Sequence, residues 1–198
     1  MKIFATALII MLCFIQGKAQ ESSKQVFKRF GFTLGSNYSN MIFSKAFPMP
    51  ETSGNIKPKP GISFGFRLYV PIKDQLSIQT EYSFSTRNAT AEKSERNYSL
   101  SYLSIPVLLK YKLSPRFFIA AGPEADLLIS SKRTTKGIKE DLEHQTEARN
   151  VGVVLGVGYN IYKSLNVNAS YLKGLINVGL ESTEFKYEIA QLSLGIDF

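Results

Sequence analysis

The sequence predicts an all-β fold: an eight-stranded antiparallel up-and-down transmembrane β-barrel. Apolar residues recur at every second position in eight segments, which is the periodicity of strands. Long polar connections alternate with tight turns between these segments, as in outer-membrane barrels with long external loops and short periplasmic turns. The last segment ends in an aromatic residue, Phe198, with apolar residues at alternate positions before it.

The first nineteen residues have the pattern of a secretory signal peptide. Lys2 provides a positive start, residues 3–15 form a short apolar stretch, and Ala19 ends a small-residue cleavage pattern. We therefore expect residues 1–19 to be removed, residues 20–29 to form a short periplasmic segment, and residues 30–198 to form the barrel.

The only cysteine, Cys13, lies inside this signal. Lipoprotein processing would need a small residue before the cysteine, and Leu12 stands there instead. The mature chain is therefore expected to have no disulfide, no reactive thiol and no cysteine metal site.

The eight alternating segments share the length of a membrane strand, about 9–11 residues for most of them. In chain order they are residues 30–39, 62–70, 76–84, 103–112, 117–130, 151–161, 165–172 and 189–198. The clearest is the second, where Ile62, Phe64 and Phe66 alternate with small residues. Each segment is predicted to cross the bilayer once.

The connections between segments alternate in length. The long polar ones are residues 41–60, 88–98, 131–149 and 175–187, and the tight turns are residues 71–75, 113–116 and 162–164. Proline, serine and aspartate supply the turn chemistry of the short connections. Both termini fall on the short-turn side, so we expect both in the periplasm and four loops outside.

The composition of the two strand faces indicates which one points outward. The polar face of the first segment consists of small side chains, namely Gly31, Thr33, Gly35, Asn37 and Ser39. Small side chains fit the narrow lumen of eight strands. The apolar faces carry no charge, as expected where a charge at mid-bilayer costs roughly 2–4 kcal/mol. The alternative, a soluble barrel with an apolar interior, would carry more charge on its polar faces.

Two prolines and one phase change interrupt the pattern. Pro106 and Pro123 lie inside segments, and a closed barrel has no edge where a missing amide is harmless. We expect a bulge or a local break at each. Leu100 and Tyr102 alternate out of phase with Leu103, which indicates a bulge near Tyr102 or a later strand start.

Inward-facing charges predict a polar network in the lumen. Its expected members are Arg67, Gln79, Glu81, Lys110, Glu124 and Asp126. If the hairpin turns at residues 71–75, Arg67 faces Gln79 and lies diagonally from Glu81. One interpretation is a polar conduit or a small-ligand site. The favoured interpretation is an ion-pair network that fills the barrel, because buried charges need partners.

The central segments also resemble a known family. Residues 102–111, YLSIPVLLKY, resemble the "YLxIPxLLKY" strand of the PorT-like outer-membrane β-barrel proteins of Bacteroidota. Residues 120–123 resemble that family's "aGP" strand, residues 152–159 its Gly-rich sixth strand, and residues 32–39 its opening strand. The resemblance implies an outer-membrane barrel that accommodates both prolines. It implies no agreed activity, although some members are implicated in protein secretion or envelope assembly.

Motifs for chemistry are missing from the sequence. It contains no nucleophile elbow, phosphate loop or metal-ligand spacing. The only histidine, His144, lies in a charged external loop, where a catalytic role would need a fixed serine or carboxylate beside it. We therefore expect no enzyme and assign no catalytic, metal or cofactor residue; a lipid hydrolase is a distant alternative.

The expected function is that of a non-enzymatic envelope protein whose loops or turns contact envelope or secretion partners. The alternative is a narrow, porin-like channel or a small-ligand-binding barrel. The net charge is +8, but the basic residues form no continuous stripe, and the expected export argues against nucleic acid as a ligand. Loop lysines suit the phosphates of lipopolysaccharide, and lipid is expected to cover the apolar face. The expected signal for the outer-membrane assembly machinery is the set Phe198, Ile196, Leu194 and Leu192.

Overall fold

The computed structural model describes residues 29–45, 56–91, 96–135, 137–142, 149–180 and 183–198. Eight long strands are β1 (Arg29–Lys45), β2 (Ile56–Lys73), β3 (Leu76–Ala91), β4 (Arg96–Lys112), β5 (Phe117–Thr135), β7 (Arg149–Asn160), β8 (Leu165–Gly174) and β10 (Thr183–Asp197). Two short ones are β6 (Ile138–Asp141) and β9 (Val178–Leu180). The predictions for the signal peptide, for Cys13 and for His144 lie outside the described residues. In the described part, no helix is long and apolar enough to cross a membrane.

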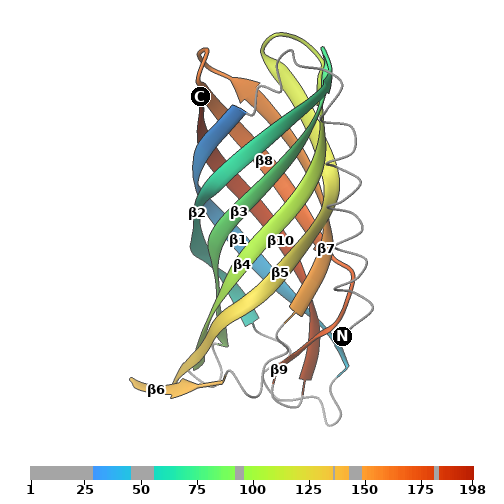
Figure 1. Cartoon of the computed structure of the whole chain (residues 1–198). Coiled ribbons are helices and arrows are strands. Elements are labelled where there is room, and N and C mark those ends of the chain that lie inside the picture. Colours follow the sequence, from blue (N-terminus) through green and yellow to red (C-terminus); the bar gives the residue numbers. More distant parts are fainter. Residues whose placement is uncertain (1–28, 46–55, 92–95, 136, 143–148, 181–182) are drawn as a thin grey trace, which may run out of the picture.

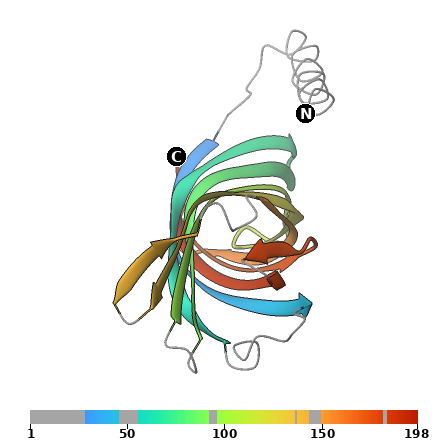
Figure 2. The same ribbon diagram turned by 90° about the horizontal axis from the view of Figure 1, so that it is seen from below.

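The eight long strands form a closed antiparallel barrel (Figures 1 and 2). Neighbours pair in the order β1-β2-β3-β4-β5-β7-β8-β10, and β10 pairs back with β1. The closing seam runs from Gly31 opposite Asp197 to Lys45 opposite Glu184. Closure satisfies the backbone groups that a sheet edge would leave unpaired. The predicted fold class is therefore confirmed, and each predicted segment lies in one of these strands except for its last residue in two cases, Ile161 after β7 and Phe198 after β10.

Strands β2 to β5 are longer than a bilayer requires, with 16 to 19 residues each. Together with β1, they extend into residues 41–45, 56–60, 88–91 and 131–135. The apolar alternation assigns these residues to loops. The loop boundaries predicted from the sequence are therefore wrong at this end. Beyond the barrel, β6 pairs with β5 in a hairpin that projects to one side (Figure 1).

Along most of the barrel the apolar face points outward. Phe32 and Leu34 in β1 are 57% and 63% exposed, whereas Thr33 between them is buried. The same alternation holds in β2, where Ile62 is exposed and Ser63 is buried. An apolar exterior around a polar interior is the arrangement of a barrel surrounded by lipid.

At the long-loop end the polarity of the two faces is reversed. The interior there is apolar and aromatic, with the buried side chains Met41, Tyr98, Leu100, Tyr102, Phe185 and Tyr187. The exterior is polar, and side-chain hydrogen bonds connect neighbouring strands there. Ser99 donates to Asn88 Oδ1 over 2.9 Å, and Thr90 donates to Asn97 Oδ1 over 2.7 Å. This is how a soluble barrel is built. The reversal explains why a search for apolar-outside alternation ends the strands too early.

Both internal prolines are accommodated without a change of register. The β3–β4 pairing skips two positions at Pro106, and the β4–β5 pairing skips two positions at Pro123, yet the register is the same on both sides of each gap. Pro123 keeps Val153 of β7 as its partner. The prolines therefore cause a local break in the pairing and no bulge.

The bulge near Tyr102 lies on the neighbouring strand. Tyr102 pairs with Leu128, whereas the residue before it pairs with Ser130, which leaves Ile129 as an extra residue in β5. Leu100 and Tyr102 both point inward, in phase with the rest of β4. The change of phase in the sequence therefore reflects the aromatic interior of the long-loop end, and β4 itself is continuous.

Candidate functional site: the charged lumen

The lumen brings together side chains from all around the barrel. Among the described residues, the buried charged groups include Arg67, Arg87, Lys110, Glu81 and Asp126. They lie on inward faces because successive residues of a strand alternate between the two sides of the sheet. Buried charges need partners, and two separate clusters provide them.

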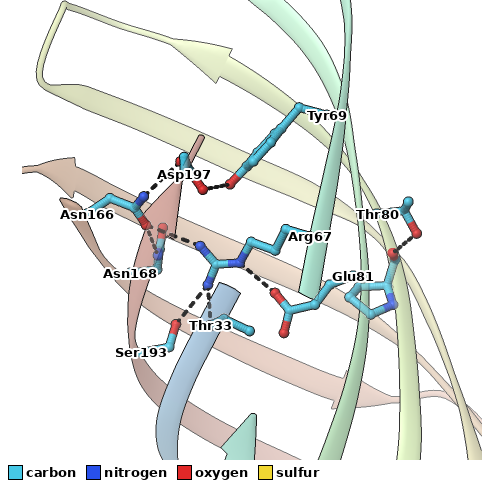
Figure 3. Close-up of polar contacts among 10 residues, drawn as sticks. Thr33, Arg67, Tyr69, Thr80, Glu81, Asn166, Asn168, Ser193 and Asp197 are labelled. Carbon is cyan, nitrogen blue, oxygen red and sulfur yellow. Dashed lines mark hydrogen bonds and ion pairs between the residues drawn. The ribbon is translucent and has the colours of Figure 1, made fainter. Parts of the chain in front are cut away.

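The first cluster is centred on Arg67 of β2 (Figure 3). Its Nε donates to Glu81 Oε2 over 2.7 Å, and its Nη1 donates to Asn166 Oδ1 over 3.1 Å. Its Nη2 donates to Thr33 over 2.6 Å and to Ser193 over 3.3 Å. One guanidinium thus ties β2 to β1, β3, β8 and β10, and its bond to a carboxylate is of the strong, charge-assisted kind.

The Arg67 cluster continues to the last strand. Asn166 donates through Nδ2 to Asp197 Oδ2 over 2.8 Å, and the Tyr69 hydroxyl donates to Asp197 Oδ1 over 3.1 Å. Asn168 donates to Asn166 Oδ1 over 2.7 Å. Figure 3 shows these side chains converging on one side of the lumen. Asp197 therefore connects the end of β10 to β2 and β8.

The register of the β2–β3 hairpin differs from the prediction. Arg67 lies directly opposite Glu81, and Tyr69 lies opposite Gln79. The prediction that Arg67 faces Gln79 is therefore wrong. The strands run on to Lys73 and Leu76, so the turn contains two residues, and a bulge at Ile72 then brings Arg67 opposite Glu81. The Arg67–Glu81 ion pair is consequently direct.

The second cluster is centred on Arg87 of β3, which the sequence analysis did not identify. Its side chain is 1% exposed, and its Nη2 lies 2.8 Å from Asp126 Oδ2 and 3.6 Å from Glu124 Oε1. The guanidinium carbon lies 4.4 Å from the ring centroid of Tyr102 and 4.7 Å from that of Tyr187. Arginine combines ion pairing with stacking on aromatic rings in this way.

Asp126 is held from three sides. In addition to Arg87, the Ser104 hydroxyl donates to its Oδ1 over 2.6 Å and Asn150 Nδ2 donates to its Oδ2 over 2.7 Å. A signal for Arg87 was present in the sequence, because it lies six residues after Glu81 and therefore faces the same side of β3. It was missed because the predicted strand ended at residue 84.

Lys110 lies beside Tyr69, at the short-turn side of the Arg67 cluster. It is 6% exposed, and its Nζ lies 3.6 Å from the ring centroid of Phe118 and 4.7 Å from that of Tyr69. This is the geometry of a cation–π contact. The six residues predicted as one network therefore lie in three places: Arg67 and Glu81 with Gln79 beside them, Glu124 and Asp126 around Arg87, and Lys110 near the short turns.

Little free space remains between the two clusters. A cavity of about 70 Å³ lies there, bordered by Arg67, Arg87, Glu124 and Phe118 among others. It has room for a few water molecules. Phe118 also borders a larger recess that opens at the short-turn end, so its ring stands between the two spaces. Gly158 of β7 makes this possible, because a Cβ there would overlap the Phe118 ring.

The last strand shows the geometry of the predicted assembly signal. Leu192, Leu194 and Ile196 point outward and are exposed. The Phe198 ring stacks on Phe30 with centroids 5.3 Å apart, and the Phe198 N–H donates to the Phe30 carbonyl over 2.7 Å. The outward apolar row of β10 therefore continues onto β1 through the contact of Phe198 with Phe30. In the described ranges, no group of three or more acidic, histidine or cysteine side chains is arranged to hold a metal ion.

Comparisons with known proteins agree with this architecture. The family model of the "Outer membrane protein beta-barrel domain" matches residues 18–179. The fold is similar to Neisserial surface protein A, with a TM-score of 0.59 and 12% identity over 85% of this chain and 97% of that one. It is also similar to Ail, the attachment invasion locus protein of Yersinia pestis, in complex with the heparin analogue sucrose octasulfate. There the TM-score is 0.52 and the identity 13%, over 86% of this chain and 99% of that one. These identities support a shared fold alone. No curated protein matches the sequence.

Proposed function

This chain belongs to the family of outer-membrane proteins with a β-barrel domain, and from that membership we propose that it is a non-enzymatic envelope protein that acts at its two ends. The observation that carries the proposal is the filled lumen. The Arg67 and Arg87 clusters leave about 70 Å³ between them, and an aromatic interior follows on the long-loop side. Contacts with envelope or secretion partners are therefore assigned to the loops and turns.

The proposed placement is the outer membrane of a Gram-negative-type envelope, after removal of the signal peptide and with both termini in the periplasm. Lipid would cover the apolar band up to the pair Phe84 and Leu103, because the next outward pair, Thr86 and Ser101, is polar. The section beyond would stand in water. Its exposed Lys57 and the other cations at this end would meet the phosphates of lipopolysaccharide.

Two finer assignments belong to the same proposal. The resemblance of residues 102–111 supports a place among the PorT-like proteins of Bacteroidota, within the broader family. The outward row of β10 that ends at Phe198 supports recognition by the outer-membrane assembly machinery, because alternating apolar residues and a terminal aromatic side chain are accessible along it.

A charge on the apolar band tests the placement in lipid. We expect Leu155→Arg in β7, whose side chain is exposed on that band, to lower the free energy of unfolding by roughly 2–4 kcal/mol in lipid vesicles. Thr90→Arg, on the outward face of the water-facing section, is expected to cost no more than the hydrogen bond from Thr90 to Asn97, about 0.5–1.5 kcal/mol. Urea titrations of both variants measure this. Equal losses would contradict the proposed position of the membrane boundary.

Conductance tests the proposal that the lumen transports nothing. The purified barrel in planar lipid bilayers is expected to give no steady single-channel current, because charged and aromatic layers close the lumen. A heat-dependent shift in gel mobility shows beforehand that the sample is folded. Steady currents from a folded sample would contradict the proposal and favour the alternative of a narrow channel.

A further inference from the structure

We propose that the recess at the short-turn end binds an acidic, extended peptide segment of a periplasmic partner. The inference rests on the proposed function, which places this end in the periplasm, and it names the end and the chemistry by which the partner binds. Its basis is the size of the recess, the sign of the charges around it and the closure of the barrel wall beside it.

The recess is large and open. Its volume is about 1190 Å³, above the roughly 300–1,000 Å³ of pockets for small ligands. Tyr69, Lys110 and Phe118 lie at its inner end, and the β2–β3, β4–β5 and β7–β8 turns surround its rim. A space of this size accommodates a stretch of polypeptide better than a compact small molecule.

Cations outnumber acids around the recess. The cationic residues that line it are Lys73, Lys110, Lys112, Arg116 and Lys163, and the acidic ones are Asp74 and Asp197. Asp197 is already engaged by Tyr69 and Asn166. A concave site with one prevailing sign of charge raises the local concentration of ligands of the opposite sign. The recess therefore favours an anion.

The distribution of these cations favours several separate carboxylates. Lys73 ends β2, Lys112 ends β4, and Lys163 lies in the turn after β7, so the charges come from different parts of the rim. Lysine is a flexible point charge, whereas arginine forks are the usual partners of a single phosphate. Lys110 adds a positive charge at the inner end, held by the Phe118 and Tyr69 rings. An extended segment with spaced Asp or Glu residues matches this pattern.

The barrel wall argues against a lipid headgroup. At the mouth of the recess, β1 and β10 remain paired as far as Gly31 and Asp197, and the Phe198 N–H donates to the Phe30 carbonyl. This seam leaves no lateral opening through which acyl chains would reach the bilayer while the headgroup lay in the recess. The ligand must therefore enter from the aqueous side.

The opposite end of the molecule provides a control for charge alone. Cations there lie beside acids, as in the ion pair between Arg133 of β5 and Glu140 of β6. Lys132 and Lys139 lie on the same hairpin and are exposed. Reversing lysines at this end changes the net charge of the protein by the same amount without touching the recess.

The experiment measures binding of a fluorescein-labelled hexaglutamate peptide to the folded full-length protein in nanodiscs, by fluorescence anisotropy at low salt. The recess variant is Lys73→Glu/Lys112→Glu/Lys163→Glu, and the matched control is Lys57→Glu/Lys132→Glu/Lys139→Glu. We expect the recess variant to bind about tenfold more weakly or worse and the control to bind within about twofold of the natural sequence. Equal weakening in both variants, or binding of tripolyphosphate but not of the peptide, would overturn the inference.

A photo-cross-linking residue in living cells separates this inference from the proposed function. It is placed at Tyr162 on the rim of the recess, which is 72% exposed, or at Ile138 in the β5–β6 hairpin, which is 68% exposed. A protein adduct at Tyr162 that disappears in the recess variant is the expected result. An adduct at Ile138 alone would overturn the recess site and leave the proposed function standing. Adducts at neither position would overturn both.

Discussion

Replacement of Arg87 by alanine is expected to lower the free energy of unfolding by about 3–5 kcal/mol, the range for removing one partner of a buried ion pair. Asp126, itself buried, would lose a cation 2.8 Å away, and Glu124 would lose the same cation at 3.6 Å. The stacking of the guanidinium on Tyr102 and Tyr187 would be lost as well. The two carboxyl groups would then face each other in a lumen with little water.

The matched control for this prediction is Arg133→Ala, which makes the same substitution in the Arg133–Glu140 pair of the projecting hairpin, where the two side chains are 19% and 48% exposed. Exposed ion pairs contribute roughly 0–1 kcal/mol, so this variant should unfold nearly as the natural sequence does. The chain has ten tyrosines and no tryptophan, and tyrosine fluorescence therefore reports urea unfolding in lipid vesicles. Similar losses in the two variants would show that the Arg87 cluster adds no special stability.

Replacement of Arg67 by alanine is expected to have a comparable effect, again about 3–5 kcal/mol. Glu81 would remain buried without the Nε donor at 2.7 Å, and Thr33, Ser193 and Asn166 would each lose a hydrogen bond from the same guanidinium. Because these partners come from four other strands, the loss should affect the whole barrel. Urea titration and the temperature of the gel-mobility shift both measure it.

A double-mutant cycle distinguishes a buried charge from lost packing. If the unpaired Glu81 carboxylate causes the loss, then Arg67→Ala combined with Glu81→Gln should be more stable than Arg67→Ala alone, because the remaining buried group is neutral. Gln79→Ala, at the neighbouring inward position of β3, controls for truncation of an uncharged lumen side chain. A double variant less stable than Arg67→Ala would contradict the ion-pair explanation.

The closed barrel could be predicted from the sequence because its determinants are local and repeated. Each strand carries its own outward apolar row, as in Ile62, Phe64 and Phe66 of β2, and the length of each connection separates the two ends. The outer extensions could not be predicted by the same rule. There the inward residues, such as Tyr98 and Leu100, are the apolar ones, so the pattern of a lipid-exposed strand ends where the section with reversed polarity begins.

The lumen was predictable only in part, because its contacts depend on register across several strands. The Arg67–Glu81 pair is a neighbour contact within one hairpin, and its exact alignment depends on the two-residue turn and on the bulge at Ile72. The contact of Arg87 with Asp126 is different. It spans β3, β4 and β5 and depends on two successive registers, which place Arg87 opposite Leu100 and Ser104 opposite Asp126. The six expected lumen residues therefore all lie inside, yet their grouping differs from the one expected.

The pairing of β1 with β10 also affects how fast the barrel folds. It joins the two ends of the described chain, from Gly31 opposite Asp197 onward, so it is the pairing of greatest sequence separation in the fold. Pairings of this kind form slowly, because the intervening chain must be ordered first. Until they form, β1 and β10 are two open edges of complementary shape, and such edges pair readily with another molecule. Closure of the barrel and pairing with a second copy of the chain therefore compete for the same edges of β1 and β10.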